Sequence, residues 1–118
     1  MSQPKRWKVL VFDDSPLSIA IATKQLEADG FEVRATTTLN QFDEALGDWL
    51  PEVILTDVKM PGMTGTELCR MLKRRYETAH VPIVLCSSLK SDELAELANE
   101  CEADGFVPKT DNMQDIAA

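Results

Sequence analysis

The sequence lacks the features that mark secreted, membrane-spanning and thiolate-metal proteins. Its 118 residues include only three cysteines, Cys69, Cys86 and Cys101, without a C-x-x-C pair or another ligand-like spacing. Such cysteines are expected to be free thiols, mostly buried, in a reducing compartment. The apolar run behind the first basic residues covers only residues 9–12, which is too short for a secretory signal or a membrane span. These absences predict a cytoplasmic protein with no membrane segment.

Positive charge is also scarce, since 12 lysines and arginines stand against 20 aspartates and glutamates and leave a net charge of −8. This balance argues against a nucleic-acid-binding surface, which needs clustered cations. It is compatible with binding a metal cation or a basic partner. The length and a hydrophobic content of 44% suit one domain over residues 1–118. Because the chain starts at Met1, we expect this domain at the N-terminus, with a longer protein possible beyond Ala118.

The pattern of apolar residues predicts a parallel sheet. Residues 9–12, 53–55 and 83–86 are apolar throughout, as in strands buried on both faces. Residues 31–35 alternate apolar and charged, and residues 105–108 are short and contain proline, so both are expected at sheet edges. Segments with helical spacing separate these strands. The alternation predicts an α/β fold, a flavodoxin-like doubly wound five-stranded parallel sheet in the order 2-1-3-4-5.

Local signals predict several helix boundaries. A serine followed by proline at 15–16 is typical of a helix start, and aspartate followed by glycine at 29–30 is typical of a helix end. The basic run at 73–75 suits a solvated helix terminus. Only residues 112–118 remain for a final helix, which is therefore expected to be short or truncated.

Acidic residues follow two of the central strands. Asp13 and Asp14 end the first strand, and Asp57 ends the third. In the order 2-1-3-4-5 the winding reverses between these strands, and ligands of open parallel sheets bind at that point. Each aspartate alone is most simply a helix cap, but three at the switch point would repel one another unless a cation such as Mg²⁺ lay between them.

The neighbouring strand ends supply groups that suit a phosphoryl ligand. Ser87 ends the fourth strand with a hydroxyl, and Lys109 follows the fifth with an ammonium. Taken singly, Ser87 suits a turn and Lys109 a solvated surface. Together with a metal they would position and neutralise a phosphoryl group, and a carboxylate can itself accept one as an aspartyl phosphate.

Four segments resemble the receiver domains of bacterial two-component response regulators, of the chemotaxis-regulator kind, over nearly the whole chain. They are V-L-V-F-D-D-S at 9–15, V-I-L-T-D-V-K-M-P-G-M-T-G at 53–65, P-I-V-L-C-S-S at 82–88 and A-D-G-F-V-P-K at 103–109. The resemblance implies that Asp57 accepts a phosphoryl group from a histidine kinase or a histidine phosphotransfer protein. It also implies a downstream output domain or partner protein, and no enzymatic turnover beyond slow self-dephosphorylation.

The same resemblance implies the metal ligands: Asp14 directly, Asp13 through water, Asp57, and the main-chain carbonyl of Lys59. The ion would be Mg²⁺. Lys59 and Leu89 would flank the path of hydrolytic water.

The resemblance further assigns a switch to Ser87 and Phe106. Ser87 would bond the phosphoryl oxygen, and Phe106 would turn inward when Ser87 moves, unless it is a plain core residue. Lys109 would pair with the phosphoryl group or with Asp57. The family usually joins this lysine to a following proline by a cis peptide bond, whereas here Thr110 follows Lys109. A cis bond before a non-proline residue costs about 2.5–4 kcal/mol, so a trans bond here would alter the position of Lys109.

Two rival functions remain open at the level of sequence. A pseudo-receiver would keep the fold and bind proteins without phosphorylation, which Thr110 and the short final helix allow. A haloacid-dehalogenase-like phosphatase would also use a nucleophilic aspartate and Mg²⁺, but it places that residue in a D-x-D motif, whereas this chain has adjacent Asp13 and Asp14.

Overall fold

A single parallel sheet forms the centre of the molecule. The computed structural model describes residues 7–49, 51–59, 64–75, 78–87 and 89–108. The strands are β1 (Lys8–Phe12), β2 (Glu32–Thr36), β3 (Val53–Asp57), β4 (Ile83–Ser87) and β5 (Gly105–Pro108). They pair in the order β2-β1-β3-β4-β5, and all four pairings are parallel. This arrangement confirms the predicted topology, including the two edge strands.

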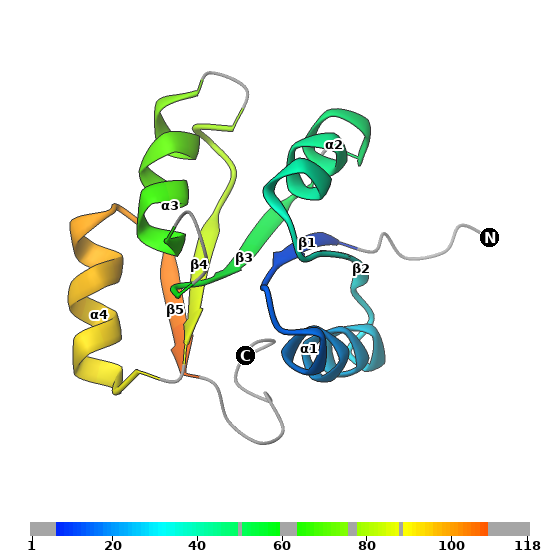
Figure 1. Cartoon of the computed structure of the whole chain (residues 1–118), viewed down its shortest axis with the longest axis horizontal. Coiled ribbons are helices and arrows are strands. Elements are labelled where there is room, and N and C mark those ends of the chain that lie inside the picture. The colour runs from blue at the N-terminus through cyan, green and yellow to red at the C-terminus, as the bar shows by residue number, and fades with distance from the viewer. Residues whose placement is uncertain (1–6, 50, 60–63, 76–77, 88, 109–118) are drawn as a thin grey trace.

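Helices cover both faces of the sheet, as Figure 1 shows. Within the described residues they are α1 (Pro16–Ala28), α2 (Leu39–Trp49), α3 (Gly65–Arg74) and α4 (Ser91–Glu100). The helices α2, α3 and α4 lie on one side, and α1 lies on the other (Figure 1). No helix among the described residues is both long and apolar enough to cross a membrane. The predicted final helix, residues 112–118, lies outside the described residues.

The core has two parts because each central strand contributes alternate residues to opposite faces. The larger part lies under α2, α3 and α4 and contains Leu10, Ile54 and Leu85, each fully buried. Its centre includes the stacked rings of Phe12 and Phe42, whose centroids are 5.0 Å apart. The smaller part lies under α1; its buried members are Val9, Val11, Ala22, Leu26, Leu55 and Cys86. The apolar strands therefore act as predicted, with partners on both faces.

Helix α1 begins and ends where the sequence predicted. The Ser15 hydroxyl accepts a hydrogen bond from the Ser18 N–H at 3.3 Å, and Pro16 takes the first helical position. At the other end Gly30 has φ +95°, a conformation that glycine adopts without strain. The N–H of Phe31 then reaches back to the carbonyl of Leu26 at 3.0 Å, so the last turn is closed by a Schellman motif.

Candidate functional site

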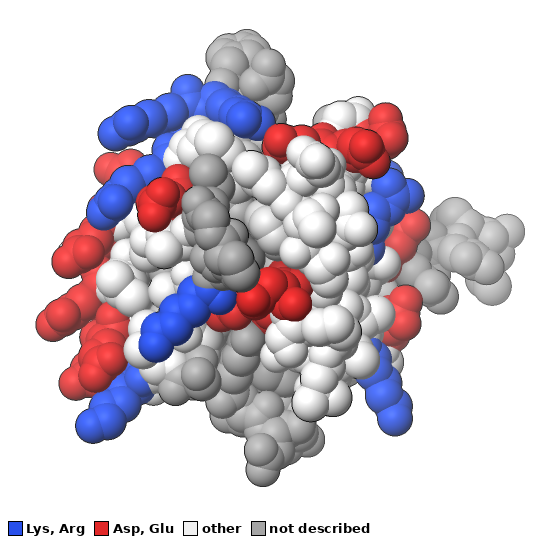
Figure 2. Space-filling view, viewed as in Figure 1, with Lys and Arg blue, Asp and Glu red and all other residues white. Residues whose placement is uncertain are grey.

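The carboxyl ends of β1 and β3 bring three carboxylates together. Phe12 of β1 pairs with Thr56 of β3, so the next residues, Asp13 and Asp57, lie level at the edge of the sheet. One oxygen from each of Asp13, Asp14 and Asp57 lies within 4.8 Å of the others. The face shown in Figure 2 also carries acidic side chains near its centre. The strand order predicted this convergence of residues more than 40 positions apart in the sequence.

The three carboxylates are held in different ways. Asp13 is buried, and its Oδ1 accepts a hydrogen bond from the Ser15 N–H at 2.9 Å, which fixes it against the start of α1. The main-chain N–H of Asp13 donates to the Thr36 carbonyl at 3.1 Å, extending the β1–β2 pairing past the strand end. Asp14 is exposed to solvent. Two buried, oriented acids and one accessible acid therefore border the same space.

Asp57 is fixed by its own neighbours in the chain. It is only 9% exposed, and its Oδ1 accepts a hydrogen bond from the Val58 N–H at 2.8 Å. The Thr56 hydroxyl donates to the Asp57 carbonyl at 3.1 Å. The side chain of Asp57 is thus oriented by main-chain geometry, which suits a group that must meet an incoming reactant in a set direction.

The start of α3 packs directly on Asp57. The Gly65 N–H donates to the Val58 carbonyl at 2.8 Å. A Cβ added at Gly65 would collide with the main-chain carbonyl of Asp57, lying 2.9 Å from its carbon and 3.0 Å from the Val58 Cα. In the sequence analysis Gly65 has no role, although this glycine stands eight residues after Asp57. The glycine itself hinted at a close approach of main chains, but its partner emerges only from the folded arrangement of α3 on β3.

Ser87 lies beside the carboxylates at the end of the neighbouring strand. It is 2% exposed, and it stands one residue past Cys86, the register partner of Asp57. Its Oγ accepts a hydrogen bond from the Leu89 N–H at 3.2 Å. Because a hydroxyl also carries one proton, Ser87 keeps a donor for a ligand.

Among the remaining predicted site residues, Phe106 and Lys59 belong to the part of the chain that the structure describes. Phe106 is 39% exposed, so its ring faces outward at the edge strand and is not a core phenylalanine. Lys59 is exposed, and its carbonyl as a metal ligand stays an expectation. Lys109 and Thr110 lie outside the described residues. Pro108, the residue before Lys109, pairs with Ser87.

The donor set fits a hard cation. Carboxylate oxygens are the ligands that Mg²⁺ prefers, at 2.0–2.1 Å, so two oxygens on opposite sides of one ion are about 4.2 Å apart. A spread of up to 4.8 Å between the three carboxylates is slightly larger. This spread suits an ion bound directly by some of them and through water by another, which is how Mg²⁺ usually binds.

A doubly wound parallel sheet with an acidic cluster at its switch point defines the class: a flavodoxin-like domain whose carboxylates suit a cation. The family described as the response regulator receiver domain matches residues 9–118. The chain belongs to this family.

Known relatives agree with this assignment. The phosphate regulon transcriptional regulatory protein PhoB of Rhizobium meliloti is 31% identical over 113 residues, covering 94% of this chain and 49% of PhoB. The chemotaxis protein CheV2 of Helicobacter pylori is 39% identical over 62 residues, covering 52% of this chain and 20% of CheV2. The chain thus spans about half or less of these curated relatives.

Solved structures show the same fold. The chemotaxis response regulator CheY4 of Vibrio cholerae superposes with a TM-score of 0.84 at 25% identity, covering 96% of this chain and 94% of CheY4. A putative response regulator from Chloroflexus aurantiacus gives a TM-score of 0.86 at 22% identity. The second likeness concerns the fold alone.

Proposed function

We propose that this receiver domain accepts a phosphoryl group on Asp57, in a Mg²⁺-dependent reaction, from the phosphohistidine of a histidine kinase or a histidine phosphotransfer protein. The cluster of Asp13, Asp14 and Asp57 carries this proposal, because it joins a main-chain-oriented carboxylate to two cation ligands. Family membership supports it and favours a receiver over a haloacid-dehalogenase-like phosphatase.

Metal binding and nucleophilic attack are assigned to individual groups of the site. Asp13, Asp14, Asp57 and the carbonyl of Lys59 would hold Mg²⁺, which when bound neutralises charge on the carboxylates and on the phosphoryl oxygens. An oxygen of Asp57 attacks the phosphorus, so that a P–O bond forms while the P–N bond to the donor histidine breaks and the imidazole leaves with the electron pair. No group on this chain has to supply a proton for that step, and positioning accounts for most of the catalysis.

Two further groups would receive the transferred phosphoryl group. The Ser87 hydroxyl donates its proton to a phosphoryl oxygen, and Lys109 supplies a positive charge from the end of β5. Ser87 would move toward the phosphoryl group as it makes this bond. Phe106, outward in this structure, would then turn into the space that Ser87 leaves and change the surface at β5.

That surface change is the proposed output of the domain. The relatives carry names from transcriptional regulation and chemotaxis, and each is longer than this chain. The output is therefore either a further domain of the same protein or a separate protein. Neither a nucleic acid nor a membrane is proposed to bind this domain, and the cytoplasm is its proposed location.

A small phosphodonor tests this function directly. Incubation with acetyl phosphate and Mg²⁺ should raise the intact mass by one phosphoryl group, and EDTA should prevent the gain. Asp57→Asn should abolish it, and Asp14→Asn should slow it strongly. Asp48→Asn is the matched control, since it removes an exposed aspartate of α2 away from the cluster and should leave the rate unchanged.

The rival functions give different results in the same experiment. A pseudo-receiver would gain no phosphoryl mass under any of these conditions. A phosphatase would turn over p-nitrophenyl phosphate continuously with Mg²⁺. Either result would overturn the proposed function.

A further inference from the structure

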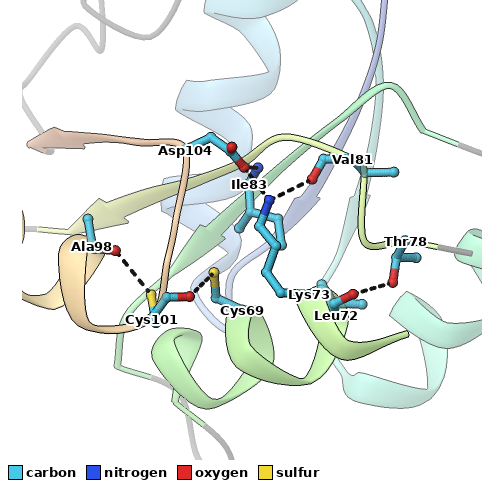
Figure 3. A network of polar contacts seen from close by, with 9 residues as sticks. All are labelled: Cys69, Leu72, Lys73, Thr78, Val81, Ile83, Ala98, Cys101 and Asp104. Carbon is cyan, nitrogen blue, oxygen red and sulfur yellow. Dashed lines mark hydrogen bonds and ion pairs between the residues drawn. The ribbon is translucent and has the colours of Figure 1, made fainter. Parts of the chain in front are cut away.

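Two buried cysteines meet between α3 and α4, far along the chain from each other. Cys69 lies in the middle of α3, and Cys101 directly follows α4. The Cys69 thiol donates to the Cys101 carbonyl at 3.3 Å, and the Cys101 thiol donates to the Ala98 carbonyl at 3.7 Å. Figure 3 shows both sulfurs in the same gap between the two helices. A contact across 32 residues of sequence therefore places two thiols together.

A groove open to solvent borders one member of this pair, Cys101. It has a volume of about 260 Å³ and is lined by Arg70, Lys73, Arg74, Glu100, Cys101 and Glu102. Cys101 itself lines this groove at 1% exposure, whereas Cys69, at 0% exposure, does not line it. A volume of about 260 Å³ is ample for a molecule as small as hydrogen peroxide.

We propose that Cys69 and Cys101 form an oxidisable thiol pair, which a peroxide entering this groove converts into an intramolecular disulfide between α3 and the end of α4. Cys101 reacts first because it borders the groove, and Cys69 resolves the product. The groove wall carries three cations against two carboxylates, Glu100 and Glu102, and this positive balance favours developing negative charge on the attacking sulfur and on the departing oxygen.

The reaction balances in two steps. The Cys101 sulfur attacks one peroxide oxygen, so that an S–O bond forms, the O–O bond breaks and water leaves, giving a sulfenic acid. The Cys69 sulfur then attacks the Cys101 sulfur. The S–S bond forms, the S–O bond breaks, and the Cys69 thiol proton leaves with the hydroxyl group as a second water molecule. The peroxide is reduced and the two thiols are oxidised.

The surroundings of Cys69 fit the role of the second thiol. Burial, with the hydrogen bond and the charge of Cys101, raises the pKa of Cys69 to about 12, against an opposing effect of Lys73. Cys69 is therefore a protonated thiol that does not compete for the peroxide. The Lys73 ammonium is itself held 2.6 Å from a carboxylate oxygen of Asp104 (Figure 3).

The third cysteine is an internal control. Cys86 is also buried, but it lies in the smaller core under α1, on the opposite face of the sheet. It does not line the groove. Its oxidation would report on global opening of the domain, and so it separates entry through the groove from reaction of the unfolded chain.

The test treats the folded protein with hydrogen peroxide, blocks remaining thiols with N-ethylmaleimide in denaturant, and maps the peptides by mass. We expect loss of two hydrogens with a Cys69–Cys101 crosslink, while Cys86 is recovered as its maleimide adduct. Cys86→Ala should crosslink normally. Cys69→Ala should leave a sulfenic acid on Cys101, which dimedone traps when it is added together with the denaturant, and Cys101→Ala should yield neither product.

Three results would overturn this inference. They are oxidation of Cys86 at the rate of the pair, crosslinks between different molecules instead of within one, and dimedone trapping of Cys69 in Cys101→Ala. The readout involves no phosphoryl group, so failure of this test and failure of the proposed function are distinguishable.

Discussion

Replacing Gly65 by alanine should damage the site through packing alone. The added Cβ would meet the carbonyl of Asp57 and lie 3.0 Å from the Val58 Cα, so the start of α3 and the end of β3 must move apart. These neighbours are main-chain atoms, so no change of side-chain rotamer can relieve the clash. The strand end that carries the proposed phosphoacceptor therefore shifts, and with it the hydrogen bond from Val58 that orients the Asp57 carboxylate.

The magnitude follows from the cost of overpacking, which is about 1–3 kcal/mol when a methyl group is forced into a filled space. Gly47 provides a matched control because it lies inside α2, and a Cβ there would meet nothing within 4 Å. Alanine is favoured over glycine in a helix by about 0.5–1 kcal/mol, so Gly47→Ala should stabilise the fold. Replacing glycine by alanine is thus expected to lower the free energy of unfolding at position 65 and to raise it at position 47.

Urea unfolding followed by tryptophan fluorescence measures both changes. For a domain of this length 1 kcal/mol corresponds to about 4 °C in Tm, so thermal unfolding gives an independent reading. Gly65→Ala should also lower the rate of phosphorylation by acetyl phosphate, and Gly47→Ala should not. Equal stability changes for the two variants, or an unchanged rate in a destabilised Gly65→Ala, would refute the reasoning from close approach.

Three further predictions concern stability at low pH, backbone strain and phosphoryl lifetime. Partial burial raises the pKa of Asp104, but hydrogen bonds from Lys73 and the Ile83 N–H and the charge of Lys73 lower it below its ordinary value of 3.8. Asp104 therefore contributes fully to the free energy of unfolding above its ordinary pKa, and this contribution is lost as pH falls through the lower pKa of the folded state. Urea unfolding at a series of pH values should show that the free energy of unfolding falls less steeply with acid in Asp104→Asn than in the parent protein. Glu102 has φ +62°, so Glu102→Gly should raise the free energy of unfolding by about 1 kcal/mol, and a decrease would contradict the strain. Leu89, partly buried near Ser87, should exclude hydrolytic water, so phosphorylated Leu89→Asn should lose phosphate faster than the parent protein, and an equal or slower loss would argue against it.

The fold could be predicted because its signals are local and repeated. The apolar run at 9–12 has no polar face, so it suits only a strand covered on both sides, and the structure covers it on both sides. The serine and proline at 15–16 and the glycine at 30 act within a few residues of themselves. Such signals fix the order of elements, and the handedness of parallel connections then restricts the strand order.

The acidic cluster could be predicted for a different reason. Asp13 and Asp57 are placed by the ends of strands, and the ends of paired parallel strands meet at one edge of the sheet. The role of Gly65 could not be derived in this way. Its importance comes from the angle at which α3 returns onto β3, and no spacing in the sequence specifies that angle.

Lys73 shows most clearly what local reasoning misses. The basic run at 73–75 suggested a solvated helix end, but the Lys73 ammonium lies 2.6 Å from Asp104, 31 residues away, with only 16% of its side chain exposed. Asp104 in turn bonds both main-chain groups of Ile83, the first residue of β4. Its carboxylate accepts from the Ile83 N–H at 2.8 Å, and its own N–H donates to the Ile83 carbonyl at 2.8 Å.

These bonds lie one step before the first β4–β5 pair, Val84 with Gly105. Asp104 thereby continues the ladder of β4 and β5 with a side chain, and Lys73 ties that junction to α3. In the sequence, the segment A-D-G at 103–105 supported the family resemblance without indicating what its aspartate contacts. Its aspartate has a physical role that depends on three elements brought together by folding, and a charge pattern along one helix cannot encode such a contact.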